Sequence, residues 1–168
     1  MTILNVPSIY SDETFRTSFA AFVQEVFTQE EIMAIDEAPY IYGAPILRVH
    51  PSSLLKVIAF LKKHPDLRLD FLNDIHGIDM KTHIELVYVL QSHHFGKIVV
   101  VKTETSRPGG SVPSLTALYP TADWQEREVY DLLGVYFEDH PNLSRILLPD
   151  DWVGHPLLKD YEQYDEGI

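Results

Sequence analysis

Two apolar segments near the middle of the chain constrain its fold more than any other feature of the sequence. Residues 83–91 carry apolar side chains at every second position, and residues 97–103 contain a run of isoleucine and valine. Both patterns are typical of β-strands. Only residues 92–96 separate the segments, which is the length of a hairpin loop, so the two strands are predicted to pair antiparallel. A β-sheet therefore forms the centre of the predicted fold.

Two further segments have the spacing of amphipathic helices. Apolar residues recur every three or four positions within residues 11–28, and again within residues 54–61. The second segment begins just after Pro51, a residue favoured in the first turn of a helix, and ends before Pro65. Two helices are therefore predicted before the strand pair.

A third helix is predicted at residues 122–133. Asp123 and Glu126 have the spacing of a capping box, in which side chains bind backbone N–H groups at the start of the helix. Gly134 can adopt the left-handed conformation that commonly ends a helix. The sequence thus indicates where this helix begins and where it ends.

The segments between these elements carry shorter patterns. Apolar runs at residues 32–35, 45–49 and 67–78 are predicted to be strands, and the last of them is expected to enter a turn at residues 76–79. Residues 105–114 are rich in proline and glycine and are expected to form an exposed loop. Helices that cover one face of such a sheet give an α+β fold with a small, mostly antiparallel sheet.

The composition changes in the last part of the chain, which becomes polar and proline-rich. Any regular element there is interrupted by Pro141, Pro149 and Pro156. We therefore expect a globular α+β domain at residues 1–136 and an extended C-terminal arm at residues 137–168. The arm would be ordered by contact and not by a core of its own.

Composition and charge exclude several classes of function. The chain contains no cysteine, which removes disulfides, thiolate zinc sites, thiol nucleophiles and iron–sulfur clusters bound by this chain. A formal net charge of -12 disfavours binding to nucleic acids or anionic lipid surfaces. No apolar run is long enough for a membrane helix and the N-terminus lacks a signal-peptide pattern, so we expect a cytosolic protein.

The sequence predicts no catalytic, cofactor-binding or metal-binding residue. A metal could in principle be bound by His93, His94, His140 and His155 together with Asp150 and Asp151. However, His93 and His94 are adjacent on a hairpin tip and point to opposite sides, His140 and His155 each precede a proline, and no helical His-x-x-x-His pair is present. The Gly-x-Ser-x-Gly turn of serine hydrolases is missing. Gly109 and Gly110 precede no phosphate-binding loop, so nucleotide binding is unsupported.

The charged residues of the third helix allow more than one interpretation. Arg127, Glu128 and Asp131 are spaced so that they lie close together on one side of the helix. They form a solvated helix face, pair with arginines of the following arm such as Arg145, or dock on a partner. None of these alternatives requires catalysis.

Aromatic residues are concentrated in the last third of the chain. Trp124 and Phe137 are expected to complete the domain core. Trp152 and Tyr161 lie in a segment too irregular to bury them internally. Since aromatic anchors are enriched at the centres of interfaces, these two are expected to contact a partner.

A set of fixed spacings runs through residues 123–161. It consists of Glu126-Arg127-Glu128, Asp131, Gly134, Phe137, His140-Pro141, Leu143, Arg145-Ile146-Leu147, Trp152, Gly154-His155-Pro156-Leu157 and Lys159-Asp160-Tyr161. This pattern resembles the signature of the thirty-kilodalton subunit, also called the C subunit, of NADH:quinone oxidoreductase (respiratory complex I), with looser similarity upstream to about Val49. Ser144 and Leu158 stand where that family usually has arginine, so ion pairs from those arginines to a neighbouring subunit are not expected here.

The resemblance implies a non-catalytic structural subunit in the peripheral arm of a proton-translocating complex. Such a protein packs chiefly against the D subunit, near the B and I subunits, and braces the electron path from NADH to quinone. Iron–sulfur clusters, FMN and quinone would be bound by partner subunits. The chain would lie on the cytoplasmic side of the cell membrane and contact it only through the complex. The residues expected at the partner interface are Glu126, Arg127, Glu128, Asp131, His140, Arg145, Trp152, His155, Lys159, Asp160 and Tyr161.

Three alternatives stay open from the sequence. The chain could be the equivalent subunit of a membrane-bound nickel-iron hydrogenase or of another quinone-linked dehydrogenase complex. It could be a stand-alone hydrolase that uses His140, His155 and nearby aspartates with a metal. It could also be a free regulatory or scaffolding module that shares the fold. Co-purification with iron–sulfur and membrane subunits would separate the complex subunit from the last two.

Overall fold

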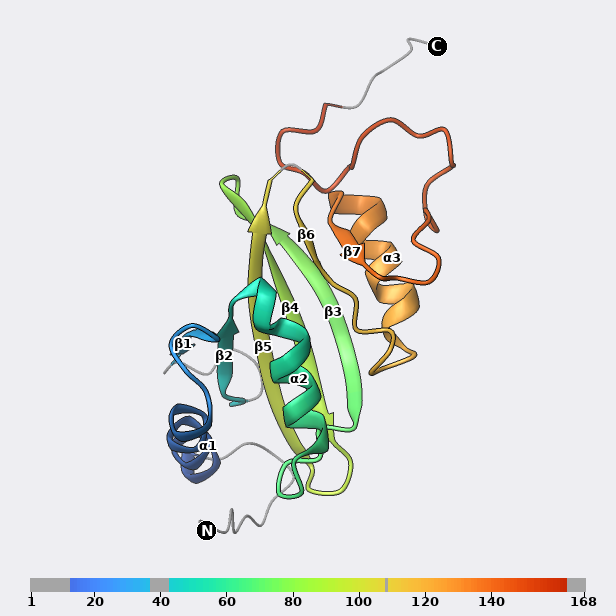
Figure 1. The fold of residues 1–168 in the computed structure, drawn as a ribbon. Coiled ribbons are helices and arrows are strands. Elements are labelled where there is room, and N and C mark those ends of the chain that lie inside the picture. The colour runs from blue at the N-terminus through green and yellow to red at the C-terminus, as the bar shows by residue number, and fades with distance from the viewer. Residues whose placement is uncertain (1–12, 37–42, 108, 163–168) are drawn as a thin grey trace.

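The computed structural model describes residues 13–36, 43–107 and 109–162. Within these ranges, a five-stranded sheet has the order β1-β2-β5-β4-β3 (Figure 1). The strands are β1 (Ile32–Asp36), β2 (Ile46–Val49), β3 (Phe71–Asp79), β4 (His83–Ser92) and β5 (Lys97–Ser106). Neighbouring strands are antiparallel except β2 and β5, which run parallel. The pairing of β4 with β5 along their full length confirms the predicted hairpin.

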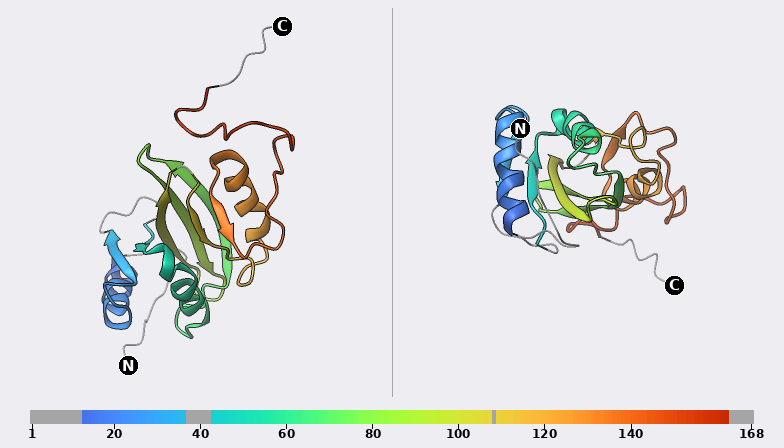
Figure 2. Two further views of the ribbon diagram at one scale, coloured as in Figure 1. Left: turned by 45° about the horizontal axis from the view of Figure 1, so that its top comes forward. Right: turned by 90° about the horizontal axis from the view of Figure 1, so that it is seen from below.

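The helices of the described residues cover one face of this sheet. They are α1 (Glu13–Val26), α2 (Leu54–Lys63) and α3 (Ala122–Leu133), and a short 3-10 helix, η1 (Pro51–Ser53), leads into α2. Figure 2 shows α1 beside β1 and β2, α2 over the middle of the curved sheet and α3 beside β3. Buried side chains from all three helices, including Phe19, Leu61 and Val129, join the inner face of the sheet in one hydrophobic cluster. The predicted α+β class is therefore confirmed. None of these helices combines the length and apolar content needed to cross a membrane.

The turn predicted at residues 76–79 is wrong, because β3 continues through Asp79 before the chain turns. Gly77 lies inside the strand, where α3 packs directly onto it. A Cβ atom at this position would lie 2.4 Å from Cδ1 of Leu133. The glycine therefore serves close helix-to-strand packing and not a turn.

The exposed loop predicted at residues 105–114 is also largely wrong. Strand β5 extends to Ser106, and β6 (Ser111–Pro113) pairs in parallel with β7 (Tyr136–Glu138) in a second, two-stranded sheet. Val112 is buried in the hydrophobic cluster, so residues 111–113 are part of the packed fold and not of an exposed loop. Strand β7 also crosses the predicted division at residue 136, and its Phe137 is 1% exposed.

Helix α3 has the predicted bounds but not the predicted N-terminal cap. Its N-cap residue, Thr121, makes no side-chain capping bond, and Glu126 points into the protein interior instead of completing a capping box. Gly134 ends the helix in the left-handed conformation, with φ 75°, as predicted. Trp124, expected in the core, is 64% exposed because it lies on the outer side of the helix.

Candidate functional site

Asp131, in the last turn of α3, is the main attachment point for the irregular C-terminal segment, which we define as residues 139–162. The Asp131 side chain is fully buried. Its Oδ2 accepts hydrogen bonds from the backbone N–H groups of residues 146–148 at 2.8 to 3.0 Å, and its Oδ1 lies 2.6 Å from Nη1 of Arg145. Burial alone would raise the pKa of Asp131, but the backbone N–H of Leu148, Arg145 and the other two N–H groups lower it to about 2.

Arg145 extends this attachment along the segment. Its Nη1 also donates to the backbone oxygen of Asp131 at 3.0 Å, and its Nη2 donates to the backbone oxygens of Trp152 and Gly154 at 3.1 and 3.0 Å. One arginine therefore joins two parts of the segment to the end of α3. Pairing between a helix carboxylate and Arg145, one of the alternatives from the sequence, is found in the structure.

Arg127 holds the same segment one helical turn earlier. Its Nε donates to the backbone oxygen of Ser144 at 3.0 Å, and its Nη2 donates to the Ser144 hydroxyl and to the backbone oxygen of Arg145 at 3.0 and 3.2 Å. Its guanidinium also lies over the ring of Trp124, 5.0 Å from the centroid. Arg127 and Asp131 thus do not pair with each other, since each binds the segment that crosses them.

The second half of the segment returns past the end of α3. His155 Nδ1 lies 2.9 Å from the backbone oxygen of Asp131, and the N–H of Leu157 donates to the oxygen of Leu132 at 3.0 Å. The His155 ring packs so closely on Gly134 that a Cβ atom there would lie 2.7 Å from it. These contacts satisfy carbonyl groups that the last turn of a helix leaves without partners.

The far end of the segment is fixed to the end of β3. Asp79, with a side chain 1% exposed, accepts a hydrogen bond from the backbone N–H of Lys159 at 2.7 Å and lies 2.9 Å from Nε of Arg107. Arg107 also binds the carboxylate of Asp160. Burial would raise the pKa of Asp79, but hydrogen bonds from Lys159, Lys81 and Arg107 hold it below its ordinary range.

The residues predicted at a partner interface differ widely in exposure. Glu126 and Asp131 are fully buried and the side chain of His140 has no exposed surface, so these three offer no surface for direct contact. Glu128, Lys159 and Asp160 are exposed, and partial burial is found for Arg127, Arg145, Trp152, His155 and Tyr161. Several members of the set, namely Arg127, Asp131, Arg145 and His155, thus make contacts within the chain that order the C-terminal segment. A role for the set at an interface stays a prediction.

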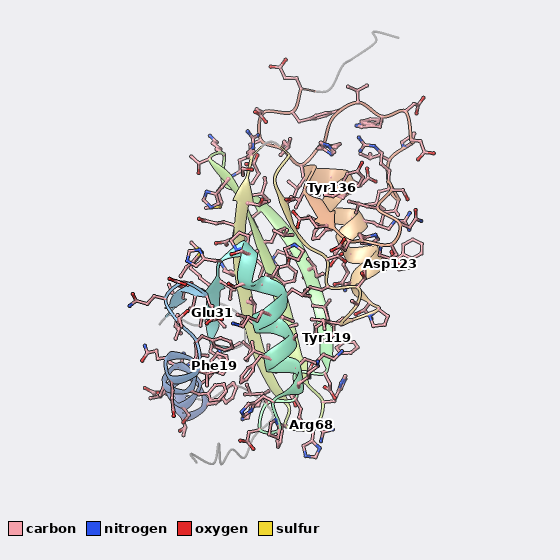
Figure 3. The ribbon with its side chains drawn as sticks, viewed as in Figure 1. Phe19, Glu31, Arg68, Tyr119, Asp123 and Tyr136 are labelled. Atoms are coloured by element: carbon pink, nitrogen blue, oxygen red, sulfur yellow. The ribbon has the colours of Figure 1, made fainter. Side chains whose placement is uncertain are left out.

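Sequence reasoning missed the apolar side chains that this segment leaves exposed. Leu147, Val153 and Leu157 are 60%, 85% and 56% exposed, and Trp124 and Tyr136 are 64% and 54% exposed. No other large apolar side chain of the described residues exceeds half exposure. Figure 3 shows Asp123 toward the first turn of α3 and Tyr136 beyond its other end, with side chains of the segment gathered along the helix between them. In the sequence, Leu147, Val153 and Leu157 could have been recognised only as apolar residues without periodicity in an acidic, proline-rich segment.

Two of the histidines considered as metal ligands, His140 and His155, lie apart. His140 Nε2 lies 3.2 Å from the backbone oxygen of Asp123, whereas His155 Nδ1 contacts that of Asp131, two helical turns later. At about 1.5 Å of rise per residue, these points are roughly 12 Å apart. Within the described ranges, no group of three or more potential ligands from His, Cys, Asp and Glu could hold a metal ion.

Comparison with known proteins agrees with the pattern in the sequence. Residues 47–166 match the family described as respiratory-chain NADH dehydrogenase, 30 Kd subunit. The C subunit of NADH-quinone oxidoreductase from Salinispora tropica is 38% identical over 132 residues, which are 76% of this chain and 54% of that protein. The C/D subunit from Chromohalobacter salexigens is 36% identical over 160 residues, which are 89% of this chain and 26% of that longer protein. The chain thus spans about half the length of the Salinispora relative and a quarter of the C/D protein.

Two solved structures share the fold at 25% sequence identity. The trypsin-resistant fragment (1-134) of Nqo5 has a TM-score of 0.60 and covers 76% of this chain, with 97% of the fragment matched. A chain of the membrane-bound sulfane sulfur reductase, an archaeal respiratory membrane complex, has a TM-score of 0.68, and 88% of this chain and 86% of that chain are matched. With most of its length matched by the family and by these relatives, the chain belongs to the family of the 30 kDa subunit, or C subunit, of respiratory-chain NADH dehydrogenase.

Proposed function

We propose that the chain is a non-catalytic structural subunit in the peripheral arm of a proton-translocating NADH:quinone oxidoreductase. In this role it packs against the D subunit and braces the electron path from NADH to quinone. Iron–sulfur clusters, FMN and quinone are bound by partner subunits, with the B and I subunits among the neighbours. The complex stands on the cytoplasmic side of the cell membrane, which this chain contacts only through its partners.

The observation that carries this proposal is the contrast between a well-fastened backbone and exposed apolar side chains in the C-terminal segment. Ordering a backbone costs about 1 to 2 kcal/mol per residue, so a fastened irregular segment needs compensating contacts. Leu143 and Leu158 supply some of them by packing on the core cluster. Leu147, Val153 and Leu157 face outward instead. Exposed apolar side chains grouped in one segment are typical of a surface that a partner covers.

Two features support the choice of partner and of the surface that it covers. The first is the C/D protein of Chromohalobacter salexigens, in which a region similar to this chain is part of the same polypeptide as the D subunit, as its name states. A second such protein, from Serratia proteamaculans, is 38% identical over 129 residues. Fusion keeps two domains at a high effective concentration, which favours partners that pack together.

The second feature is charge. The segment also exposes Asp139, Asp150 and Asp151, so it fits a partner surface that offers both apolar and basic residues. We therefore propose that the D subunit covers the exposed Leu147, Val153 and Leu157 of the segment, which we call the docking face.

A second candidate complex follows from one of the solved structures. The chain of the archaeal sulfane sulfur reductase covers more of this chain than the Nqo5 fragment does, and that complex is not named as an NADH dehydrogenase. The same fold therefore also fits a quinone-linked dehydrogenase or membrane-bound hydrogenase with another electron donor. Isolation of the intact complex and identification of its redox centres separates the two candidates.

The docking face is tested by a double substitution, Val153→Asp with Leu157→Asp. Both side chains are more than half exposed, so the free energy of unfolding of the isolated variant should lie within about 1 kcal/mol of the wild-type value. Burial of two carboxylates against an apolar, unpaired surface should sharply reduce the amount of the D subunit that co-purifies from membranes.

A control is Leu55→Asp, which places one carboxylate at a 38% exposed leucine in the first turn of α2; each single variant, Val153→Asp or Leu157→Asp, is compared with it at equal charge. The Leu55→Asp variant should retain the D subunit. The docking face is disproved if the double variant retains that partner as fully as the wild type, or if the α2 control loses it equally.

A further inference from the structure

A group of buried polar side chains lies under the first half of α3. At its centre is Glu126, which is 0% exposed. Its Oε1 accepts a hydrogen bond from the backbone N–H of Leu115 and its Oε2 one from the Ser114 hydroxyl, both at 2.7 Å. These two donors are neutral, so neither balances a negative charge on the carboxylate.

His140 approaches Glu126 from the beginning of the C-terminal segment. Its Nδ1 accepts a hydrogen bond from the backbone N–H of Asn142 at 3.0 Å, so in the neutral ring the proton is on Nε2. Nε2 lies 3.2 Å from the backbone oxygen of Asp123, 3.4 Å from its Oδ1 and 3.9 Å from Oε2 of Glu126. The side chains of His140 and Glu126 are 0% exposed, whereas that of Asp123 is 40% exposed, so the ring is enclosed with the Glu126 carboxyl group alone.

The groups that face Glu126 supply very little positive charge. Asp123 lies on the same helix, Tyr88 faces it from β4, and His140 faces it from beyond β7. Among the ion pairs of the described residues, the histidine is the one basic partner within reach of Glu126. The Tyr88 hydroxyl is buried without a hydrogen-bond partner, and burial raises its pKa well above the ordinary value, so it stays neutral.

We propose that the proton on Glu126 latches the start of the C-terminal segment, which covers this carboxyl group with His140, onto α3, and that loss of this proton loosens the latch. With the proton bound, the buried carboxyl group is neutral. Without it, a carboxylate whose two hydrogen-bond donors are neutral is buried beside the His140 ring, and opening of the segment lets water reach it, so desolvation favours the open state.

The side that moves is the segment and not the helix. Helix α3 is fixed by the close contact between Leu133 and Gly77. His140, in contrast, follows a tight turn in which Asp139 has φ 61°, and an irregular chain comes after it. Burial raises the pKa of Glu126 to about 7, because its effect outweighs that of the hydrogen bonds from Leu115 and Ser114, which lower the pKa. The latch therefore responds in the neutral pH range.

The latch itself does not depend on the proposed function. Only its effect on partner binding rests on that function, because the segment that the latch fastens carries the docking face. The test of the latch uses the isolated full chain and needs no partner. Hydrogen exchange at the backbone N–H groups of His140 and Asn142 is measured at about pH 6 and about pH 8 and corrected for the intrinsic rate. Protection should fall roughly tenfold or more over this interval in the wild type, since local opening is then coupled to proton loss.

Glu126→Gln keeps the shape of the side chain and removes its proton exchange, so the dependence on pH should disappear. The matched control is Glu85→Gln, because Glu85 is also buried but binds Arg48 and Lys102 at 2.7 and 2.8 Å on the opposite face of the sheet. This control should keep the dependence. The latch would be overturned if protection depended on pH equally in Glu126→Gln and in the wild type, or if it did not depend on pH in the wild type.

A direct titration covers the case in which Glu126→Gln does not fold. The side-chain carboxyl carbon of Glu126 is followed by NMR in the wild-type chain, and its midpoint is expected near 7. A midpoint near the ordinary value of 4.5 would overturn the latch. Failure of the docking face in co-purification leaves both measurements unaffected, so the two proposals fail separately.

Discussion

The attachment of the C-terminal segment to α3 should depend on a single buried carboxylate. Asp131→Asn removes the charge that accepts hydrogen bonds from three backbone N–H groups and pairs with Arg145 at 2.6 Å. The amide keeps one acceptor oxygen, but its nitrogen cannot accept the remaining bonds. The guanidinium of Arg145, with a side chain 14% exposed, is left without its counter-charge.

Breaking a buried ion pair by removing one partner costs about 3 to 5 kcal/mol. We take the lower end, about 3 kcal/mol, because the Arg145 side chain is not completely buried and keeps its bonds to Trp152 and Gly154. This loss corresponds to a shift of roughly a hundredfold toward the open segment. The apolar contacts of Val129 and Leu133 are untouched, so global melting should change much less than local opening.

Hydrogen exchange at the N–H groups of Leu147 and Leu148 measures this opening, and limited proteolysis of the segment provides a second readout. Asp150→Asn is the control, since it removes an exposed carboxylate from the same segment. Unchanged exchange in Asp131→Asn, or the same increase in Asp150→Asn, would refute the reasoning. Combining Asp131→Asn with Arg145→Met should cost much less than the sum of the two single changes, because both remove the same contacts.

Two further predictions concern stability. Gly77→Ala should destabilise the domain by about 1 to 3 kcal/mol in chemical denaturation, because the new Cβ would lie 2.4 Å from Leu133. The control, Gly109→Ala, should cost less, because no atom lies within 4 Å of its Cβ position, although its φ is positive. The reverse order of the two costs would contradict the packing argument. The second prediction is a pH effect from Glu126. Its pKa is raised from 4.5 to about 7 in the folded chain, so the protonated form is stabilised. This stability is fully present below pH 4.5 and is lost as pH rises to about 7, by about 3 kcal/mol at about 1.4 kcal/mol per pH unit. Glu126→Gln should abolish this part of the pH profile, and an identical profile in the variant would count against it.

The sequence by itself determined the elements whose signals are local. The alternation at residues 83–91 and the valine-rich run at 97–103 specify strands, and the short connection between them leaves only an antiparallel pairing. Gly134 marks the end of α3 because its backbone conformation there, φ 75°, is one that side chains with a Cβ disfavour. The fixed spacings of residues 123–161 likewise identified the family independently of the fold.

Tertiary structure decided the roles that depend on residues distant in the chain. Glu126 has the spacing of a capping residue, yet it is bound by Ser114 and Leu115, which only the fold brings beneath α3. Gly77 is a residue type expected in a turn, yet it lies in a strand, where Leu133 packs onto it.

The candidate site shows the same limit. From the spacing of Arg127 and Asp131, a solvated face, pairing with arm arginines such as Arg145, and docking on a partner all stayed open. The structure selects among them, because both residues bind the C-terminal segment and Asp131 pairs with Arg145. Periodicity records which side of an element is apolar. It does not record which distant backbone groups will need donors or acceptors there, and in this chain that requirement makes Asp131 a buried attachment for the N–H groups of residues 146–148.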